Sequence, residues 1–458
     1  MKTLRTALTA TLLLAACTFD VPDLNRPGIE SLQNPTPSQV EALATGLLIG
    51  ARASYIDDTG VVSEWGVLGR ESLVLTPSDP RFVSELLQGP NLDPGSGNFG
   101  GNNWRLPYAN IRGANLLLNA LDNPTLVGLT TAQKESLRGF AETIQALDYL
   151  QVLDAHDSNG VVLDVNHDLG STPAPIVTST DDAFTFLEKL LDDAQAHLAA
   201  GGSAFPIPLG TGFTGFDTPA TFAKFNRALR ARVAVYHGKF ADALTALAAS
   251  FLDTGAPLTL GVYHAYGSGT GDTPNDLNAS EILCHPSVVL EAEALPGGGS
   301  KCSGAPPLPL DCLDERVGAK VKALAKPTAL SNHSSGYVFT LYPASTSPIA
   351  IIRNEELILL RAEANIGLGN VGVAKADINF IRTNSGGLPA KGTLDATNIL
   401  DELLNQKRYS LLFEGGHRWI DLRRYGKLDF AHVAQDTPQD TLHARYPLPL
   451  IETQPRGF

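Results

Sequence analysis

A short stretch near the carboxy terminus holds the side chains that most resemble an active site. Carboxylates, a histidine and three arginines lie close together between Glu414 and Arg424. They suit either acid–base chemistry or a network of ion pairs that locks one helix to the next. Because the guanidinium group is well suited to such pairing, we favour the structural network. Its expected members are Glu414, Arg418, Trp419, Asp421 and Arg423.

No catalytic motif accompanies these charges. The GxSxG, HExxH and phosphate-loop patterns do not occur. Glycoside hydrolysis needs two carboxylates across a cleft, and 48 acidic residues supply chance candidates that decide nothing. We therefore expect that the protein is not an enzyme and needs no cofactor. Residues 164–170 partly match a calcium loop, but the glycine falls one place late and a solvated turn fits better.

Three of the four cysteines lie within the body of the chain. Cys302 and Cys312 flank a proline-rich loop, and a disulfide between them is the natural pairing in an oxidising compartment. This pairing leaves Cys284 as a single thiol. Zinc binding is disfavoured because the cysteines lack CxxC or HxxxH spacing, and we expect no metal site.

The first sixteen residues have the features of an export signal. Lys2 and Arg5 precede an apolar run, residues 7–16, that is too short to cross a bilayer. The run ends in Leu14-Ala15-Ala16-Cys17, which resembles the bacterial lipobox, so we expect a diacylglycerol group on Cys17. An ordinary secretory signal is the alternative. The polar, proline-rich residues 17–37 are expected to form a flexible tether.

Loop aromatics with polar neighbours are the expected ligand contacts. Apolar ring faces beside hydrogen-bonding groups suit sugar rings and other polymer units. The candidates are Tyr263, Tyr266, Trp65, Phe99, Tyr337, Tyr342, Arg81 and Asn102. Tyr263 and Tyr266 are favoured, because the insertion around them, residues 254–348, has little hydrophobic pattern to bury them. Trp104 is assigned to the core.

Paired helices are expected to carry these loops. In residues 231–244 a helix with small residues ends near Gly238 and a second helix begins at once, as in tetratricopeptide repeats. A second pair is predicted around Gly369. Two weaker pairs, 38–55 with 107–121 and 132–154 with 181–199, bring the number to about four. The fold class is therefore mainly α, with long irregular loops such as residues 76–103 and only a short strand near 336–342.

The net charge and the hydropathy of the chain limit the kinds of partner that it can bind. The net charge is −14, which disfavours binding to nucleic acids and to anionic lipid heads. After residue 16 no apolar stretch approaches the ~20 residues of a membrane helix, so the acyl chains would be the only membrane contact. The expected organisation is a signal peptide (1–16), a lipidated tether (17–37) and a helical-repeat domain (38–458).

The last third of the chain resembles the carboxy-terminal signature of SusD/RagB proteins. The matching segments are Arg353 to Ala364, Asn379 to Arg382, Arg408, and Phe413 to Gly426, followed by Tyr446-Pro447-Leu448-Pro449. Upstream, Trp104 to Asn115 and Asp217 to Arg232 also fit. Residues 139–143 depart from the family pattern, which weakens any argument from that helix.

The resemblance implies a SusD-like helical scaffold with four tetratricopeptide-like pairs and an acylated cysteine. It also implies a face that captures oligosaccharides, peptides or other polymers, and a place as a lid over a TonB-dependent, SusC-like outer-membrane transporter. The expected function is therefore non-catalytic nutrient capture at the cell surface. The alternatives are a tetratricopeptide-like scaffold for envelope proteins and a glycoside hydrolase.

Overall fold

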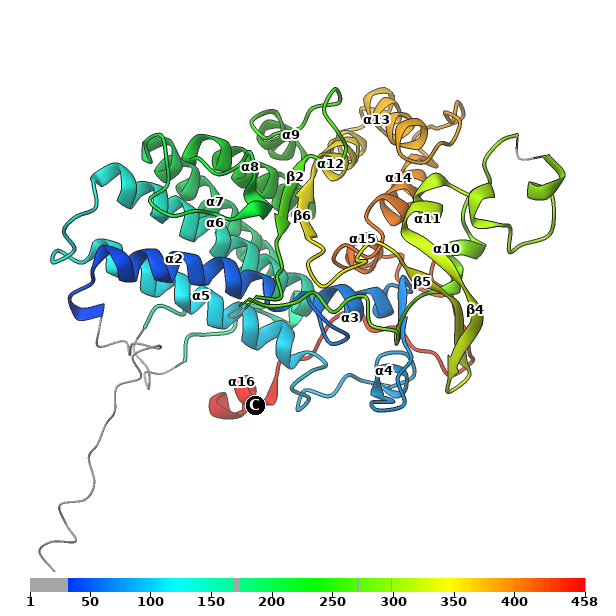
Figure 1. Cartoon of the computed structure of the whole chain (residues 1–458), viewed down its shortest axis with the longest axis horizontal. Helices are drawn as coiled ribbons and strands as arrows, with labels where there is room; N and C mark the ends of the chain where they lie inside the picture. Colours follow the sequence, from blue (N-terminus) through cyan, green and yellow to red (C-terminus); the bar gives the residue numbers. More distant parts are fainter. Residues whose placement is uncertain (1–31, 168–172, 270–271, 298, 458) are drawn as a thin grey trace, which may run out of the picture.

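The computed structural model describes residues 32–167, 173–269, 272–297 and 299–457. The predicted signal peptide, Cys17 and most of the predicted tether lie outside the described residues, as does part of the possible calcium loop. Helices are the main regular structure of the molecule, with three small sheets among them (Figure 1). In the described part of the chain, no helix combines the length and hydrophobicity needed to cross a membrane.

Two helix pairs form the amino-terminal half. Helix α2 (Pro37–Arg52) packs on α5 (Gly101–Asp122), and α6 (Thr131–His156) packs on α7 (Thr180–Ala200). Helices α5 and α6 also contact each other, so the two pairs form one continuous stack (Figure 1).

The stack continues through two further pairs. Helix α8 (Pro219–Tyr236) packs on α9 (Phe240–Ala248), and α12 (Asn354–Gly367) packs on α13 (Val371–Asn384). Gly238 and Gly369, which connect the helices of each pair, both have a φ of 77°. This left-handed conformation favours glycine and permits the immediate turn between helices. The prediction of a mainly α fold with about four helix pairs is confirmed.

Helix α2 begins one residue before the predicted segment at 38–55. Thr36 caps it: its side chain accepts from the Gln39 backbone N–H, and the Gln39 side chain accepts from Thr36. Pro37 occupies the first helical position, where its missing N–H costs nothing.

Three two-stranded antiparallel sheets involve the insertion at 254–348. Strand β1 (Ser72–Val74) pairs with β3 (Ile282–Cys284), and β2 (Gly261–His264) pairs with β6 (Ile349–Arg353). The third sheet is the hairpin of β4 (Val321–Leu330) and β5 (His333–Phe339). The predicted strand at 336–342 thus overlaps β5.

Short helices fill the connections. They are α3 (Val61–Leu68), α4 (Arg81–Ser84), α10 (Pro286–Leu290), α11 (Glu315–Lys320), α14 (Ile399–Ser410), α15 (His417–Arg424) and α16 (Leu450–Thr453). Single 3-10 turns are η2 (Asp157–Asn159), η3 (Thr211–Phe213), η4 (Gly299–Cys302), η5 (Leu310–Cys312) and η6 (Gln454–Arg456).

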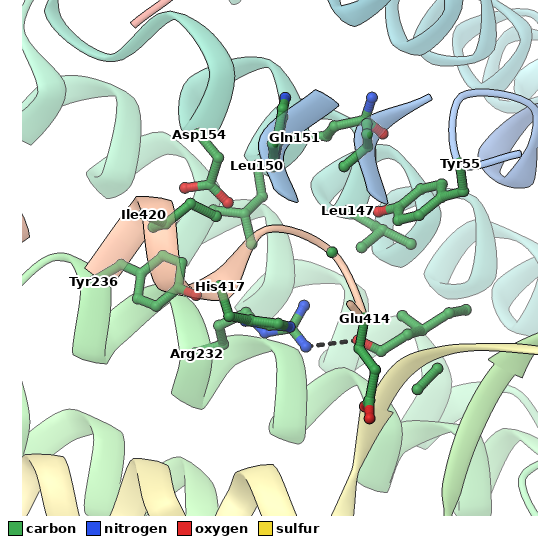
Figure 2. A pocket seen from close by; sticks show the side chains of 15 residues that line it. Tyr55, Leu147, Leu150, Gln151, Asp154, Arg232, Tyr236, Glu414, His417 and Ile420 are labelled. Atoms are coloured by element: carbon green, nitrogen blue, oxygen red, sulfur yellow. Dashed lines mark hydrogen bonds between the residues drawn. The ribbon is translucent and has the colours of Figure 1, made fainter. Parts of the chain in front are cut away.

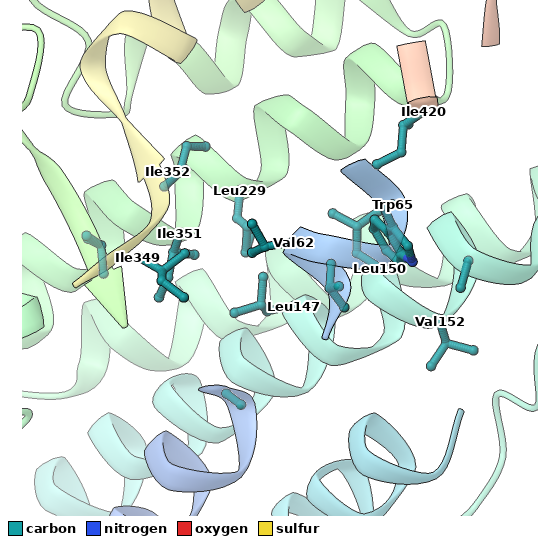
Figure 3. Close-up of a cluster of buried hydrophobic side chains, with 14 of the residues drawn as sticks. Val62, Trp65, Leu147, Leu150, Val152, Leu229, Ile349, Ile351, Ile352 and Ile420 are labelled. Atoms are coloured by element: carbon teal, nitrogen blue, oxygen red, sulfur yellow. The ribbon is translucent and has the colours of Figure 1, made fainter. Parts of the chain in front are cut away.

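One large hydrophobic core joins the scaffold to the insertion. It runs from Val40 on α2 to Tyr446 near the carboxy terminus. Figure 3 shows its centre, where Val62, Leu147 and Ile351 approach one another from α3, α6 and β6. A smaller core lies among α12, α13 and α14. The insertion is therefore packed onto the helices and does not stand apart from them.

Two cysteines of the insertion form a disulfide, and the third is a free thiol. Cys302 and Cys312 form a disulfide, which closes a loop at the right-hand end of the molecule in Figure 1. Cys284 is a free thiol and is completely buried in β3. Burial raises the pKa of this thiol above its usual range, so Cys284 is an inert core residue.

Candidate functional site

A cleft of about 540 Å³ lies between the helical stack and the β4–β5 side of the insertion. We call it the charged cleft. The side chains that matter for its chemistry are Tyr263, Tyr342, Lys320, Arg353, Glu355 and Glu414. Its volume lies within the range typical of small-molecule sites in proteins.

Each wall of the charged cleft comes from a different element. Tyr263 lies on β2, and Arg353 ends β6 and precedes α12. Lys320 is the last residue of α11, and Glu414 lies between α14 and α15. The turn after Glu414 needs glycine, because a Cβ on Gly416 (φ 70°) would lie 2.3 Å from the Trp65 Cβ.

Glu414 is held by two cations. Arg353 donates to both of its carboxylate oxygens, at 2.7 Å from Nε and 3.0 Å from Nη2, and Lys320 donates at 2.9 Å. Burial alone would raise the pKa of Glu414, but the neighbouring Arg353 and Lys320 lower it to about 2. Arg353 also pairs with Glu355, whose pKa is lowered in the same way against the effect of burial.

These pKa directions bear on catalysis. Glycoside hydrolysis needs a carboxyl group that stays protonated near neutral pH and can donate to the leaving oxygen. Glu355 and Glu414 instead remain ionised and are occupied by Arg353 and Lys320. They are unsuited to act as a general acid, and they can accept hydrogen bonds from ligand hydroxyl groups.

The charges that line the cleft balance. Glu315, Glu355 and Glu414 are matched by Arg316, Lys320 and Arg353. A cleft with equal numbers of acidic and basic groups offers many hydrogen-bonding partners without favouring a ligand of either sign.

A second hollow adjoins the first at Tyr263. It has a volume of about 170 Å³ and is lined mainly by apolar groups of α2 and of the turn that precedes α8, including Ile49, Pro208 and Phe213. Tyr263 borders both hollows, and its hydroxyl donates to the Thr259 carbonyl. The tyrosine ring therefore stands where a polar and an apolar site meet.

A third cavity lies deeper and is too small for a sugar. Its volume is about 30 Å³, which admits roughly one water molecule. Figure 2 shows Tyr55, Asp154, Tyr236 and His417 around it, with Glu414 at its edge. Burial lowers the pKa of His417 to about 4, so this imidazole is neutral near neutral pH.

The predicted ligand residues divide between this site and the core. Tyr263 is half-buried at the cleft, and Tyr342 lines the cleft although its hydroxyl is used by the Phe413 carbonyl. Tyr337 on β5 is half-buried and lines none of the three cavities described above. Tyr266 is 7% exposed, and its hydroxyl donates to the Arg52 carbonyl.

Two of the predicted ligand contacts were wrong. Trp65 is 2% exposed and packs on Trp419, with ring centroids 5.6 Å apart, and Phe99 is fully buried. A ring enclosed by the core has no free face for a ligand. Trp65 belongs to α3, whose residues are all buried, and Phe99 lies in a segment with few periodic apolar residues but is buried by long-range contacts.

The polar candidates near Phe99 serve local structure. Arg81 is exposed, pairs with Asp79 at 2.6 Å and lies over the Phe99 ring, 5.0 Å from its centroid. Asn102 is half-buried near the start of α5 and accepts a hydrogen bond from Arg105 at 3.1 Å. Neither residue lines the charged cleft.

The predicted network around α15 has two kinds of member. Glu414 and Asp421 are in ion pairs, the latter with Lys407 at 2.7 Å. Arg418 and Arg423 instead donate to the backbone carbonyls of residues 432 and 444. Trp419 is fully buried, and its indole N–H donates to the carbonyl of residue 443. The stretch thus joins helices and also fixes the carboxy-terminal segment.

Sequence reasoning missed part of the cleft wall. Lys320, Arg316 and Ser385 were not singled out, and Ser385 donates to Glu355 at 2.6 Å. The sequence did contain a signal for Arg316 and Lys320, because they follow Asp314, a residue type that often caps the start of a helix.

Comparison with known proteins relates part of the chain to a known family. The model described as "SusD family" matches residues 342–448, which include Tyr342, Arg353, Glu355 and Glu414 of the cleft. This segment of the chain is similar to SusD-family proteins. A comparison with curated proteins finds no match.

Solved SusD-like structures share the whole fold. A SusD-like carbohydrate-binding protein from Bacteroides fragilis is similar with a TM-score of 0.67 and 14% identity, covering 87% of this chain and 88% of that one. Surface glycan-binding protein A from Bacteroides thetaiotaomicron, in complex with laminarihexaose, gives 0.63 and 13%, with 92% and 98% coverage. A laminarin-binding SusD-like protein gives 0.60 and 19%, also with 92% and 98%. These likenesses show that the chain has the fold of the SusD-like structures.

Proposed function

We propose that the protein belongs to the SusD family and captures an oligosaccharide in the charged cleft without cleaving it. The observation that carries the proposal is the charged cleft itself: a cavity of about 540 Å³ with balanced charges and a half-buried tyrosine at its border. Sugars carry hydroxyl groups that pair with such charged donors and acceptors, and their apolar faces pack on aromatic rings. Two similar structures are named for laminarin or a laminarin oligosaccharide, which supports a glycan as ligand.

The two hollows beside Tyr263 suggest how a chain of sugars would lie. One sugar unit would use the hydrogen-bonding groups of the charged cleft, and the next would cross the Tyr263 ring toward the apolar hollow. A ligand of more than one unit would therefore bind better than a monosaccharide, because only the longer ligand reaches both hollows.

The test is titration calorimetry of the purified chain with laminarihexaose, maltohexaose and a panel of other oligosaccharides. For a sugar that binds, Tyr263→Ala should weaken affinity by about tenfold or more, which corresponds to ~1.4 kcal/mol. Tyr337→Ala is the matched control, because Tyr337 is also half-buried but lines none of the three cavities.

Two results would contradict this proposal. Equal losses in both tyrosine variants would place the ligand elsewhere. No heat with any glycan or peptide would instead favour the scaffold alternative.

We further propose that the captured ligand passes to a TonB-dependent, SusC-like outer-membrane transporter, and that acylation of Cys17 holds the protein at the outer surface. The match of residues 342–448 to the SusD family model and the lipobox-like sequence support this placement. Purification from native outer membranes in mild detergent should bring down a large β-barrel protein. Its absence would count against the transport role and would leave glycan capture to be judged by calorimetry.

A further inference from the structure

A cluster of three potential metal ligands lies away from the charged cleft, where the β4–β5 hairpin meets the carboxy-terminal segment. It consists of His333, Asp436 and Asp440, and one ligand atom from each lies within 4.8 Å of the other two. His333 is the first residue of β5, directly after the two-residue turn of Ser331 and Asn332, which have positive φ values of 49° and 65°. We propose that this cluster binds one divalent transition-metal ion, such as Zn²⁺, and so fastens the hairpin to the carboxy-terminal segment.

The hydrogen bonds of His333 orient it as a ligand. Its Nδ1 lies 3.1 Å from the Ser331 carbonyl, and its Nε2 lies 3.0 Å from Asp440 Oδ1. With Nδ1–H donating to the Ser331 carbonyl, Nε2 on the side of Asp440 is the nitrogen that would present its lone pair to a metal ion, which is the usual arrangement of a metal-binding histidine.

The two carboxylates are fixed by the chain around them. Asp440 accepts from the backbone N–H groups of Asp436 and Thr437, at 2.8 and 3.2 Å, and from the Thr437 hydroxyl at 2.7 Å. Asp436 Oδ2 accepts from His285 Nε2 at 3.0 Å, which leaves Oδ1 available. His285 must carry its proton on Nε2, because its Nδ1 accepts from the Ser287 N–H.

The donor set and spacing indicate the class of ion. One imidazole nitrogen and two carboxylate oxygens suit Zn²⁺, Co²⁺ or Mn²⁺ better than Ca²⁺, which takes six or more oxygen ligands. With bonds of about 2.1 Å, the 3.0 Å between His333 Nε2 and Asp440 Oδ1 corresponds to an angle of about 90° at the metal. Asp436 is exposed and can move toward the ion, while water fills the remaining positions.

Other histidines with two acidic neighbours lack this geometry. His197 contacts Glu135 and Glu142, and His237 contacts Asp181 and Glu188, in each case through opposite ring nitrogens. Carboxylates on opposite sides of a ring cannot share one ion with it. Among the described residues, the cluster at His333 is the group whose ligand atoms converge.

A nearby cation limits the affinity. Arg70 is buried, donates to the Thr441 carbonyl at 3.1 Å and interacts electrostatically with Asp436 and Asp440. Its charge opposes a second cation at the cluster. The two carboxylates of the cluster offset part of this repulsion.

The test is titration of the metal-free full chain with Zn²⁺ by calorimetry. We expect one ion per chain, a higher melting temperature, and a visible absorption band when Co²⁺ is used. Asp436→Asn should weaken Zn²⁺ binding by at least about tenfold, because it removes an anionic ligand but can still accept from His285. Asp429→Asn is the control, since Asp429 is an exposed carboxylate 2.7 Å from His432 in the same segment.

Three outcomes would overturn the proposal. They are no Zn²⁺ uptake by the wild-type chain, uptake that Asp436→Asn leaves unchanged, and equal weakening in both aspartate variants. Because Asp436 is exposed, its variant should keep the wild-type melting temperature in chelator, which separates lost binding from misfolding. His333→Gln, measured in the same way, should lose both Zn²⁺ uptake and the metal-induced rise in melting temperature.

Discussion

Single buried charges hold the helices of this protein in register. Lys407 is 3% exposed and lies between Glu363 and Asp421, at 2.8 and 2.7 Å. Arg232 donates to both oxygens of Glu356, at 2.7 and 2.8 Å. A buried ion pair adds little net stability compared with apolar packing, but removal of one partner leaves a costly isolated charge. These residues thus act mainly by excluding other arrangements of the helices.

Glu414 provides a prediction about pH. The pKa of its side chain is 4.5 in an unfolded chain and about 2 in the folded one, because Arg353 and Lys320 outweigh the effect of burial. A lowered pKa contributes stability above pH 4.5, and this contribution is lost as the pH falls toward 2. Glu414→Gln should therefore lower the free energy of unfolding by about 3 kcal/mol near pH 7 and by progressively less below pH 4.5.

Urea unfolding of both proteins between pH 7 and pH 3 measures this difference. Asp122→Asn serves as the control, because the Asp122 carboxylate is 66% exposed and pairs only with Arg138. If the difference in free energy of unfolding between the wild-type chain and Glu414→Gln stayed constant down to pH 3, the Glu414 carboxylate would not be held ionised by its neighbours.

Close helix contact at the level of elements depends on Gly139 in α6. A Cβ on this residue would lie 2.6 Å from the Ala194 carbonyl oxygen and 2.9 Å from the Leu198 nitrogen, both on α7. Gly139→Ala should push the two helices apart and cost about 1–3 kcal/mol. Gly46→Ala on α2 is the contrast: no atom of the described residues would lie within 4 Å of the added Cβ, and alanine should stabilise that helix by about 0.5–1 kcal/mol.

Thermal and urea unfolding of the two glycine variants should give changes of opposite sign. If both substitutions stabilised the protein, α6 and α7 would be able to move apart without any loss of stability.

The helices were predictable where their apolar residues recur regularly. The predicted segments at 132–154 and 181–199 differ from α6 and α7 by only one or two residues at each end. Strand β4 was missed because it is mostly exposed and contains Pro327, so it shows no clear alternation. Residues 76–103 were expected to be a loop, and they largely are, but Phe82 and Phe99 are buried by distant contacts.

The candidate site was predictable only in part, because many of its residues are far apart in the sequence and meet only in the folded chain. Tyr263 was identified because few apolar neighbours in sequence could cover it. Lys320 and Glu414 are 94 positions apart, and only the fold shows that they are partners. The expectation of no metal rested on the spacing of the cysteines, whereas His333 and Asp440 are 107 positions apart.

The whole molecule depends on its final segment. Tyr446 is fully buried: its N–H donates to the Ala155 carbonyl at 2.9 Å and its hydroxyl to Glu64 at 3.0 Å. In a chain that ends after Arg445, the free energy of unfolding should fall by about 3–5 kcal/mol, as it does when a large aromatic side chain is removed from a core. A chain that ends after Pro449 loses only the more exposed α16 region and should unfold nearly as the full chain does.

The two truncated chains are compared by their midpoints of urea unfolding. If the chain that ends after Arg445 and the chain that ends after Pro449 had similar midpoints, Tyr446 would not complete the core.

The burial of Tyr446 against residues of the first helices also has a consequence for biogenesis. A ribosome delivers the amino-terminal helices first, yet the space between them is filled by a residue that emerges long after them. A nascent polypeptide that still lacks Tyr446 would thus remain loosely structured.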